Sequence, residues 1–173
     1  DWRNILRTSA SDSLAVKIDA TLTNLLGSHD TTYGEDNTPL AIQDLLDSVG
    51  SMDAADVPQE DRNWCISALE KVNWLNHDVI INQLYIGQRT PVTNAEIGQV
   101  YGGRVHVTTN LTAGTAGKKS GFFNRNAYAK AMRRNPFTMI LDNPNTASHE
   151  LAMFAIWGIK ELRDNHGVSL FGK

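Results

Sequence analysis

The stretch Val57–Leu75, VPQEDRNWCISALEKVNWL, carries two adjacent structural signals. Its centre, NWCIS, is a short apolar run that predicts a buried strand. Ser67-Ala68-Leu69-Glu70 follows at once and forms an S-x-x-E capping box, in which polar side chains satisfy the backbone N–H groups that a helix start leaves without partners. We therefore expect a strand that leads directly into a helix reaching about Leu75, and NHDVIINQLY (76–85) either continues this helix or forms a separate turn.

Two further helices are expected before this stretch. Residues 11–28 should form the first, because apolar residues recur there every three or four positions and Gly27 suits a helix end. The apolar stripe consists of Leu14, Ile18, Leu22 and Leu25. The polar stretch SHDTTYGEDNT (28–38) that follows is typical of an exposed linker.

The second helix should begin at Thr38-Pro39. Threonine can cap the first N–H groups of a helix, and proline suits the first helical position. The expected buried face consists of Ile42, Leu45, Leu46, Val49 and Met52.

Beyond Leu75 the chain alternates between loops and short regular segments. The stretch 86–103 is rich in glycine and predicts a loop, and RVHVTT (104–109) alternates as a half-buried strand does. NAYAKAMRRN (126–135) predicts a helix that ends before Pro136, FTMIL (137–141) a strand, and DNPNTASH (142–149) a turn. The segment 150–173 fits either a helix or a strand buried on both faces. Its aromatic and β-branched residues, with Gly158, favour the strand.

A glycine-rich loop with two lysines lies within Asn110–Met132 and raises the question of phosphate binding. A phosphate-binding loop requires G-x-x-x-x-G-K-[ST] followed at once by a helix. If Gly117-Lys118 supplied the G-K pair, the first glycine would be Thr112 and the metal ligand would be Lys119. SGFFN (120–124), which resembles a short buried strand, stands where the helix should begin. The pattern therefore favours a mobile surface loop.

No residue pattern in the sequence indicates catalysis, a cofactor or a metal. The histidines lie at positions 29, 77, 106, 149 and 166, and they form neither H-x-x-x-H nor H-E-x-x-H. Cys65, between Trp64 and Ile66, is expected to be a buried and inert thiol. The sequence thus predicts a protein that is not an enzyme and has no catalytic, cofactor-binding or metal-binding residues.

The composition is that of an ordinary globular protein rather than of a polyanion-binding module. The formal net charge is −3, and 41% of the residues are hydrophobic. If the protein meets DNA, we expect it to do so as a container wall. The single cysteine excludes an internal disulfide and fits a reducing, cytoplasmic origin. No apolar run approaches the ~20 residues that span a bilayer, so no membrane partner is expected.

The order of several segments resembles one known family. They are LAVKIDATLTNLL, TPLAIQDLLDSV, VPQEDRNWCISALEKVNWL, VYGGRVHVTTNL, GFFNRNAYAKAM and AIWGIKEL. This order is similar to that of the C-terminal two-thirds of a tailed-phage major capsid protein of the Hong-Kong-97-like fold. The family's N-terminal arm and its long hairpin, the E-loop, have no counterpart in the sequence. The chain also opens at Asp1 without a methionine, so an N-terminal part is expected to be unrepresented.

The resemblance implies an α+β fold with a spine helix, a peripheral domain and an axial domain. Carried onto this chain, residues 1–37 would be the spine helix and linker, residues 38–149 the axial domain, and residues 150–173 the strands that return to the peripheral domain. In this family the axial domain points toward the symmetry axes. The loop Gly87–Asn94, with Gln88, Arg89 and Thr90, or the loop Thr112–Gly121, with Lys118 and Lys119, would then contact neighbouring copies.

The resemblance also implies a function. The protein would build an icosahedral shell of hexamers and pentamers around packaged double-stranded DNA. It would be part of the virion, assembled in the cytoplasm of the bacterial host, with scaffolding, portal and decoration proteins as further partners. Two alternatives remain open at this point. One is the shell of a cellular nanocompartment of the same fold, and the other is a small α/β nucleotide-binding enzyme.

Overall fold

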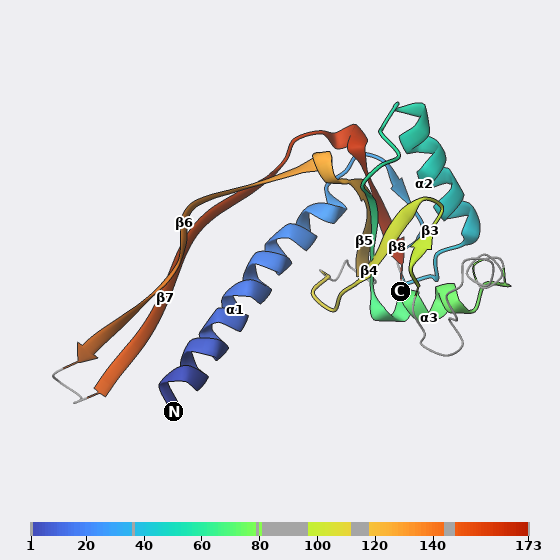
Figure 1. Cartoon of the computed structure of the whole chain (residues 1–173). Helices are drawn as coiled ribbons and strands as arrows, with labels where there is room; N and C mark the ends of the chain where they lie inside the picture. The colour runs from blue at the N-terminus through green and yellow to red at the C-terminus, as the bar shows by residue number, and fades with distance from the viewer. Residues whose placement is uncertain are drawn as a thin grey trace.

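The computed structural model describes residues 2–35, 37–78, 80, 97–111, 118–143 and 148–172. Figure 1 shows three parts: the long helix α1 (Trp2–Asn24), a long ribbon of the two strands β6 (Tyr128–Asn143) and β7 (Ser148–Glu161), and a body built on a six-stranded sheet. α1 and the ribbon both extend away from the body, and α1 contacts β7. The mixture of helices with mostly antiparallel strands confirms the predicted α+β class.

The sheet of the body has the strand order β1-β8-β5-β2-β4-β3. Its members are β1 (Thr32–Tyr33), β2 (Arg62–Ile66), β3 (Gln99–Val100), β4 (Gly103–Val107), β5 (Lys118–Asn124) and β8 (Gly167–Gly172). The pairs β1–β8 and β2–β4 are parallel, and the other neighbours are antiparallel. β8, which is the last strand in sequence, therefore lies between a strand from the start of the chain and one from its middle.

The core of the body is centred on the strand predicted from NWCIS. Trp64 of β2 stacks on its cross-strand partner Phe122 with ring centroids 3.8 Å apart, and meets Trp74 edge-on at 5.5 Å. All three rings are fully buried. The indole Nε1 of Trp64 donates to the carbonyl of Val100 at 2.9 Å, so burial leaves its polar atom satisfied. The buried strands expected at NWCIS and SGFFN are thus confirmed as parts of β2 and β5.

The capping signal after β2 is also confirmed. Ser67 lies at the N-cap of α3 (Ala68–Leu75), and its hydroxyl accepts a hydrogen bond of 3.0 Å from the backbone N–H of Glu70. The helix ends at Leu75, as predicted.

The second helix begins later than predicted. α2 spans Ile42–Ala54, and the residue before it, Ala41, has an extended backbone. The cap comes from within the helix, because the Asp44 carboxylate accepts from the N–H of Ala41 at 3.0 Å. The backbone N–H of Leu40 lies 3.4 Å from the carboxylate of buried Glu70, which holds this stretch in extended form against α3. Thr38-Pro39 therefore precedes the helix instead of starting it.

Only part of the predicted buried face of α2 is buried. Leu45 and Met52 are fully inaccessible, whereas Leu46 is 42% exposed. The expectation for Leu46 was wrong, because the core approaches α2 from the side on which Leu45 and Met52 lie.

The first helix begins earlier and ends earlier than predicted. α1 ends at Asn24, and a 3₁₀ turn, η1 (Leu25–Gly27), follows. The predicted stripe is half-buried along its length. The linker predicted to be exposed is not wholly so, because it contains β1 and the buried residue His29.

The helix predicted over 126–135 is absent, and this prediction was wrong. After a short 3₁₀ turn, η2 (Arg125–Ala127), the chain forms the 16-residue strand β6. Its register with β7 shifts between Met132 and Arg134 and again between Arg134 and Phe137. Pro136 lies in the second irregularity, where its missing N–H costs no ladder hydrogen bond. Pairing with β7 has overridden the helical preference of the alanine-rich sequence.

The last segment is a strand, as predicted, but it is not buried on both faces. β7 runs from Ser148 to Glu161, and none of its described side chains is buried. A 3₁₀ turn, η3 (Asp164–His166), then leads into β8. The expected domain boundary at 149/150 falls within the β6–β7 hairpin, and β8 lies in the same sheet as β2 and β5. The division of the chain into peripheral and axial domains stays a prediction.

The glycine turn before the predicted strand RVHVTT is a tight hairpin. Val100 pairs with Gly103, and the two residues between them, Tyr101 and Gly102, have φ angles of 45° and 81°. Two successive positive φ values are typical of the type I′ turn that joins twisted strands. The turn and strand β4 confirm the motif quoted as VYGGRVHVTTNL. Among the helices formed by the described residues, none is long and apolar enough to cross a membrane.

Candidate assembly surface and a buried junction

The β6–β7 ribbon is a long apolar element without a core of its own. None of the described side chains of β6 and β7 is buried. Several large apolar side chains are strongly exposed: Met132 37%, Met139 44%, Ile140 55%, Leu141 45%, Phe154 47% and Ile156 50%. Neighbours such as Met139 and Ile140 point to opposite faces of a strand, so both faces of the ribbon are apolar.

Such a ribbon needs a covering surface. An isolated two-stranded ribbon is only marginally stable in water, and exposed apolar patches of this kind mark interaction sites. α1 adds further exposed apolar side chains, with Ile5 70% and Val16 52% exposed. α1 and the ribbon together form what we call the assembly surface: residues 4–24, 128–141 and 150–161.

Local contacts stiffen the middle of the ribbon. Phe137 and Phe154 are cross-strand partners whose rings stack at 5.6 Å. The Arg134 guanidinium lies 3.9 Å from the centre of the Phe137 ring, a cation–π contact. These contacts link the two strands beside the second register shift without burying the ribbon.

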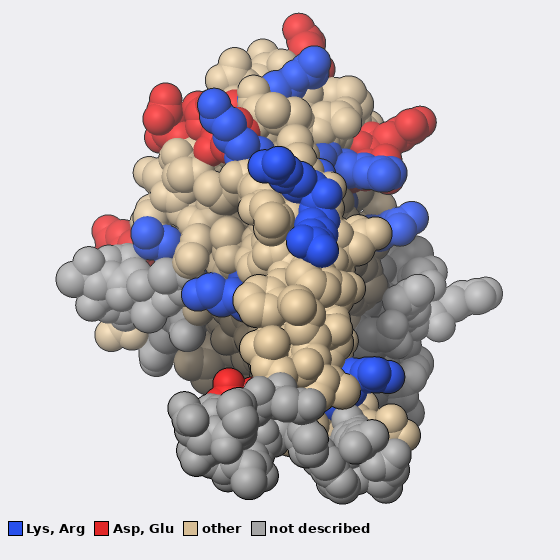
Figure 2. All heavy atoms as spheres, turned by 90° about the vertical axis from the view of Figure 1, so that its left-hand side faces the viewer, with Lys and Arg blue, Asp and Glu red and all other residues tan. Residues whose placement is uncertain are grey.

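The ribbon also carries a group of exposed cations. They are Lys130, Arg133 and Arg134 on β6 and Lys160 on β7. Figure 2, which faces the outer end of α1 and the ribbon, shows Lys and Arg side chains mainly in the upper half of this face, with Asp and Glu side chains toward its edges and uncharged side chains in the strip below. The charges of this face are thus concentrated away from the uncharged strip.

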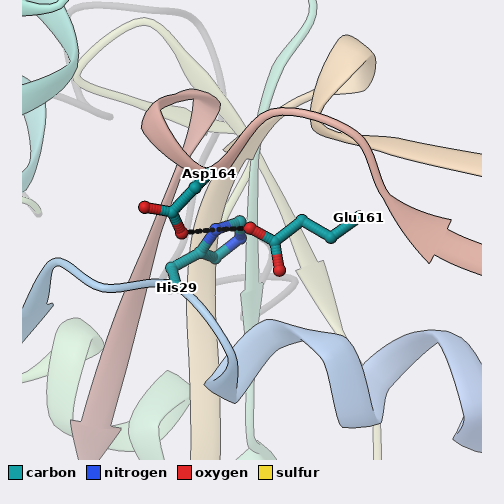
Figure 3. A group of neighbouring side chains, drawn as sticks. All are labelled: His29, Glu161 and Asp164. Carbon is teal, nitrogen blue, oxygen red and sulfur yellow. Dashed lines mark ion pairs between the residues drawn. The ribbon is translucent and has the colours of Figure 1, made fainter.

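A buried junction lies where the ribbon and α1 join the body. The His29 side chain is fully buried just after η1, and Figure 3 shows it facing Glu161 at the end of β7 and Asp164 in η3. His29 Nδ1 is 3.2 Å from Glu161 Oε1 and 3.5 Å from Asp164 Oδ1. The three ligand-type atoms lie within 4.8 Å of one another, so these residues have the donor set of a metal site.

Other groups fix the members of this junction in place. The other ring nitrogen of His29, Nε2, is hydrogen-bonded to the Tyr128 hydroxyl. The Ser28 hydroxyl donates to Glu161 Oε2 at 2.6 Å, and the backbone N–H of Asp30 donates to Asp164 Oδ1 at 3.0 Å. A Cβ on Gly167 would overlap the His29 ring, so glycine is needed there.

The electrostatics of the junction favour an ionised Asp164 and a neutral phenol. Partial burial works against ionisation of Asp164, but the Asp30 N–H, the hydrogen bond with Glu161 and the neighbouring His29 outweigh it and lower the pKa of this carboxyl. Burial, and then the negative charge of Glu161, raises the pKa of Tyr128. Tyr128 therefore keeps its proton and can serve only as a hydrogen-bonding group.

The single cysteine has the environment that the sequence predicted. Cys65 is buried in β2, and burial together with the nearby Asp19 carboxylate raises the pKa of its thiol to about 11. A thiol held in its protonated form is a poor nucleophile.

The structure describes only two of the five residues that the sequence predicted to contact neighbouring subunits. Gln88, Arg89 and Thr90 lie outside the described residues. Lys118 and Lys119 belong to β5 rather than to a loop, and the Lys119 side chain passes over Gly27 of η1. A strand, not a helix, begins at Lys118, which removes the helix N-terminus that a phosphate-binding loop requires. Their role between subunits stays a prediction.

The His29 junction was missed at the sequence level. His29 is more than 130 residues away from Glu161 and Asp164 in the sequence, and it was assigned to an exposed linker. No spacing rule connects positions 29, 161 and 164. Only the pairing that brings β7 and β8 back beside η1 does so.

Comparison with known proteins identifies the fold. No protein-family model matches the chain, and no curated protein matches it in sequence. Among solved structures, one from Mycobacterium phage Che8 matches 95% of this chain with a TM-score of 0.81 at 18% identity. The capsid of the cyanophage P-SCSP1u matches 100% of it with a TM-score of 0.76 at 15% identity.

The chain has the fold of phage capsid proteins. The mature capsid of bacteriophage PhiM1 adds a third match, with a TM-score of 0.75 at 12% identity over 99% of this chain. A virus-like particle from Pyrococcus furiosus is also similar, with a TM-score of 0.59 at 14% identity over 94% of the chain. This chain spans 61–66% of the length of the four chains it matches. The predicted capsid fold is confirmed.

Proposed function

We propose that this protein is a subunit of the icosahedral capsid shell of a tailed phage, arranged in hexamers and pentamers around packaged double-stranded DNA. The observation that carries the proposal is the assembly surface: a long helix and a 16-residue strand with its partner, apolar and unburied, on a fold shared with phage capsids. The described residues leave the ribbon uncovered, and we propose that neighbouring subunits bury it. Its work is association, and no enzymatic activity is proposed.

Shell closure requires many contacts, each of which can be weak. Heterologous patches repeated around a ring and then around a closed shell add their energies, so modest apolar contacts suffice. We propose that α1 and the β6–β7 ribbon form the peripheral part of the subunit. The body, with its sheet and the helices α2 and α3, forms the axial part.

The contacts at the symmetry axes are proposed for the loop around Gln88, Arg89 and Thr90, and for Lys118 and Lys119 at the start of β5. Scaffolding, portal and decoration proteins are proposed as further partners. We propose that packaged DNA is contacted weakly and without sequence preference. A net charge of −3 gives the subunit little attraction for DNA phosphates, so the shell would not hold the genome tightly. We propose that the protein assembles in the bacterial cytoplasm and becomes part of the virion.

Electron microscopy tests this proposal directly. The complete open reading frame that contains residues 1–173 is expressed, purified and imaged. Closed particles of uniform size are expected. A monodisperse monomer at all concentrations, with no particles in the presence of its phage's other structural proteins, contradicts the proposal.

Matched variants test the assembly surface itself. Ile140→Gln and Ile156→Gln remove exposed apolar side chains from the ribbon, and Leu69→Gln removes one that is 60% exposed on α3 in the body. All three subunits should keep the wild-type melting temperature, because none of these side chains is buried. Particle yield should fall several-fold for the ribbon variants and stay unchanged for Leu69→Gln. Equal yields from all four proteins would remove the ribbon from the shell contacts.

A second candidate function is the shell of a nanocompartment that encloses proteins. The structural similarity to the Pyrococcus furiosus virus-like particle supports this candidate. The contents of purified particles distinguish the two. Nuclease-protected DNA in particles from infected cells supports the phage capsid, and enclosed protein without DNA supports the compartment.

A further inference from the structure

We propose that the buried junction is a Zn²⁺ site in which His29 Nδ1, Glu161 Oε1 and Asp164 Oδ1 are the three protein ligands. The inference is independent of the proposed function, because all three ligands belong to one chain. The shell contacts proposed above do not use the buried side chain of His29, and the proposal gives this group of side chains a role of its own.

The spacing of the donor atoms fits a tetrahedral ion. Zinc binds nitrogen and carboxylate oxygen at about 2.0–2.1 Å, so two ligand atoms at tetrahedral positions lie about 3.3 Å apart. The two distances from His29 Nδ1, 3.2 Å to Glu161 and 3.5 Å to Asp164, lie on either side of this value.

The orientation of His29 gives a second and independent argument. Nδ1 is buried and finds no hydrogen-bond partner among the described residues, although Glu161 Oε1 is 3.2 Å away. The two oxygens therefore lie off the line along which an Nδ1–H would point. Oxygens off that line are poorly placed for a hydrogen bond, but they can share with Nδ1 an ion that lies between the three atoms.

The partner of the other ring nitrogen supplies the tautomer that a metal needs. The Tyr128 hydroxyl lies 3.4 Å from the Leu25 carbonyl, to which it donates, and it can then accept from His29 Nε2–H. With the proton on Nε2, the lone pair of Nδ1 faces the two carboxylates. A hydrogen bond to the second ring nitrogen is the usual support of a metal-bound histidine.

The charge of the ligand set matches a divalent cation. With both carboxylates ionised and the imidazole neutral, the three side chains carry −2, which Zn²⁺ would cancel completely beside the fully buried ring. Ser28 and the Asp30 N–H orient the carboxylates from outside and complete the support.

The location gives the site a mechanical consequence. Its ligands come from the turn after α1, the end of β7 and the turn before β8. One ion would therefore fasten both arms of the assembly surface to the body at a single point and fix the angle at which they leave it.

Calorimetric titration of the chelator-treated protein with ZnCl₂ tests the site. The wild type should bind one Zn²⁺ with micromolar or tighter affinity, and its melting temperature should rise on binding. Glu161→Gln and Asp164→Asn keep the size of each side chain and should each weaken binding by more than about tenfold. Circular dichroism confirms that both variants are folded.

Two control variants separate this site from adventitious zinc. Asp30→Asn removes an exposed carboxylate beside the site but keeps the backbone N–H that supports Asp164, and His106→Gln removes an exposed histidine. Both should bind Zn²⁺ as the wild type does. Absence of binding in the wild type overturns the proposal, and the junction is then an ion pair alone. Undiminished binding in folded Glu161→Gln and Asp164→Asn also overturns it, because the ion is then held elsewhere.

Discussion

Cys65 shows how one buried position controls both reactivity and alkaline stability. Trp64 and Ile66, its neighbours on β2, are fully buried, and the thiol itself is almost so. Burial first, and then the Asp19 carboxylate, raises the pKa of the thiol from 9.0 to about 11. Below pH 9 the thiol is protonated in the folded and the unfolded chain alike, so it adds no pH dependence there.

Above pH 9 the unfolded chain loses this proton while the folded chain keeps it. The free energy of unfolding should therefore fall as pH rises from 9 to 11, by about 3 kcal/mol in total from this group. Urea unfolding of the wild type and of Cys65→Ala at pH 8, 9 and 10 measures the effect. The difference in stability between the two proteins should shift with pH in favour of the variant. Parallel curves over this range would show that the thiol titrates normally.

At the residue scale, the sequence predicted local chemistry and missed distant chemistry. The hydroxyl of Ser67 and the N–H of Glu70 are three residues apart, so the capping pattern is complete within one helical turn. His29 depends on Glu161 and Asp164, and no pattern near position 29 indicates a buried ring. The neighbouring glycines and polar residues pointed to an exposed linker instead.

At the scale of elements, β6 is the clearest case of long-range pairing overriding local preference. NAYAKAMRRN has the composition of a helix, and a proline follows it as if to end one. β7 contributes cross-strand partners all along this stretch, including Trp157 opposite Met132 and Phe154 opposite Phe137. Strand preference depends on such partners, which a single sequence does not display. The segments whose signals were self-contained, β2 with α3 and the glycine turn with β4, were predicted correctly, whereas β3 lies in a stretch that was expected to be a loop.

An engineered disulfide tests the register of the ribbon. Ala131 and Gly158 are cross-strand partners in the structure, and paired residues in antiparallel strands have Cα atoms about 4.5–5.5 Å apart, within the range of a disulfide. In a Cys65→Ala background, Ala131→Cys with Gly158→Cys should form this bond on mild oxidation. Peptide mapping by mass spectrometry under non-reducing conditions detects it. A helix over 126–135 would leave the two cysteines unlinked.

The control pairs Ala131→Cys with Ser169→Cys. Ser169 lies in β8, in the other sheet, and its hydroxyl is buried against the Leu26 carbonyl. This pair should stay reduced under the same conditions. A link in the control, or none in the test pair, would contradict the register.

At the scale of the whole molecule, stability is concentrated in the body. The large fully buried side chains, Trp64, Trp74 and Phe122 among them, belong to the sheet and its helices, and the ribbon has no buried described side chain. The sequence predicted the α+β class and, through its ordered resemblance, the capsid fold. It did not predict that the body has a core and that the ribbon has none. The pattern of apolar residues in β6 and β7 does not tell whether they pack on the chain's own core or on another molecule.

Hydrogen–deuterium exchange should separate the two parts. In the unassembled subunit, amides of β2 and β5 should exchange slowly, and those of β6 and β7 should exchange orders of magnitude faster, because few buried contacts oppose opening of the ribbon. In assembled particles the ribbon amides should become protected while the β2 and β5 amides change little. Equal protection of ribbon and sheet in the free subunit would mean that the ribbon is stable without partners.

The place of β8 in the sheet has a consequence for biosynthesis. β8 separates β1 from β5, and it is made after every other strand. While the ribosome is still translating residues 167–172, Thr32 and Tyr33 have no neighbour to pair with, and one side of β5 is open. A nascent chain therefore cannot complete its body before the ribbon has been synthesised. If the chain assembles into a shell as proposed, this order of synthesis would delay polymerisation until β8 has been made.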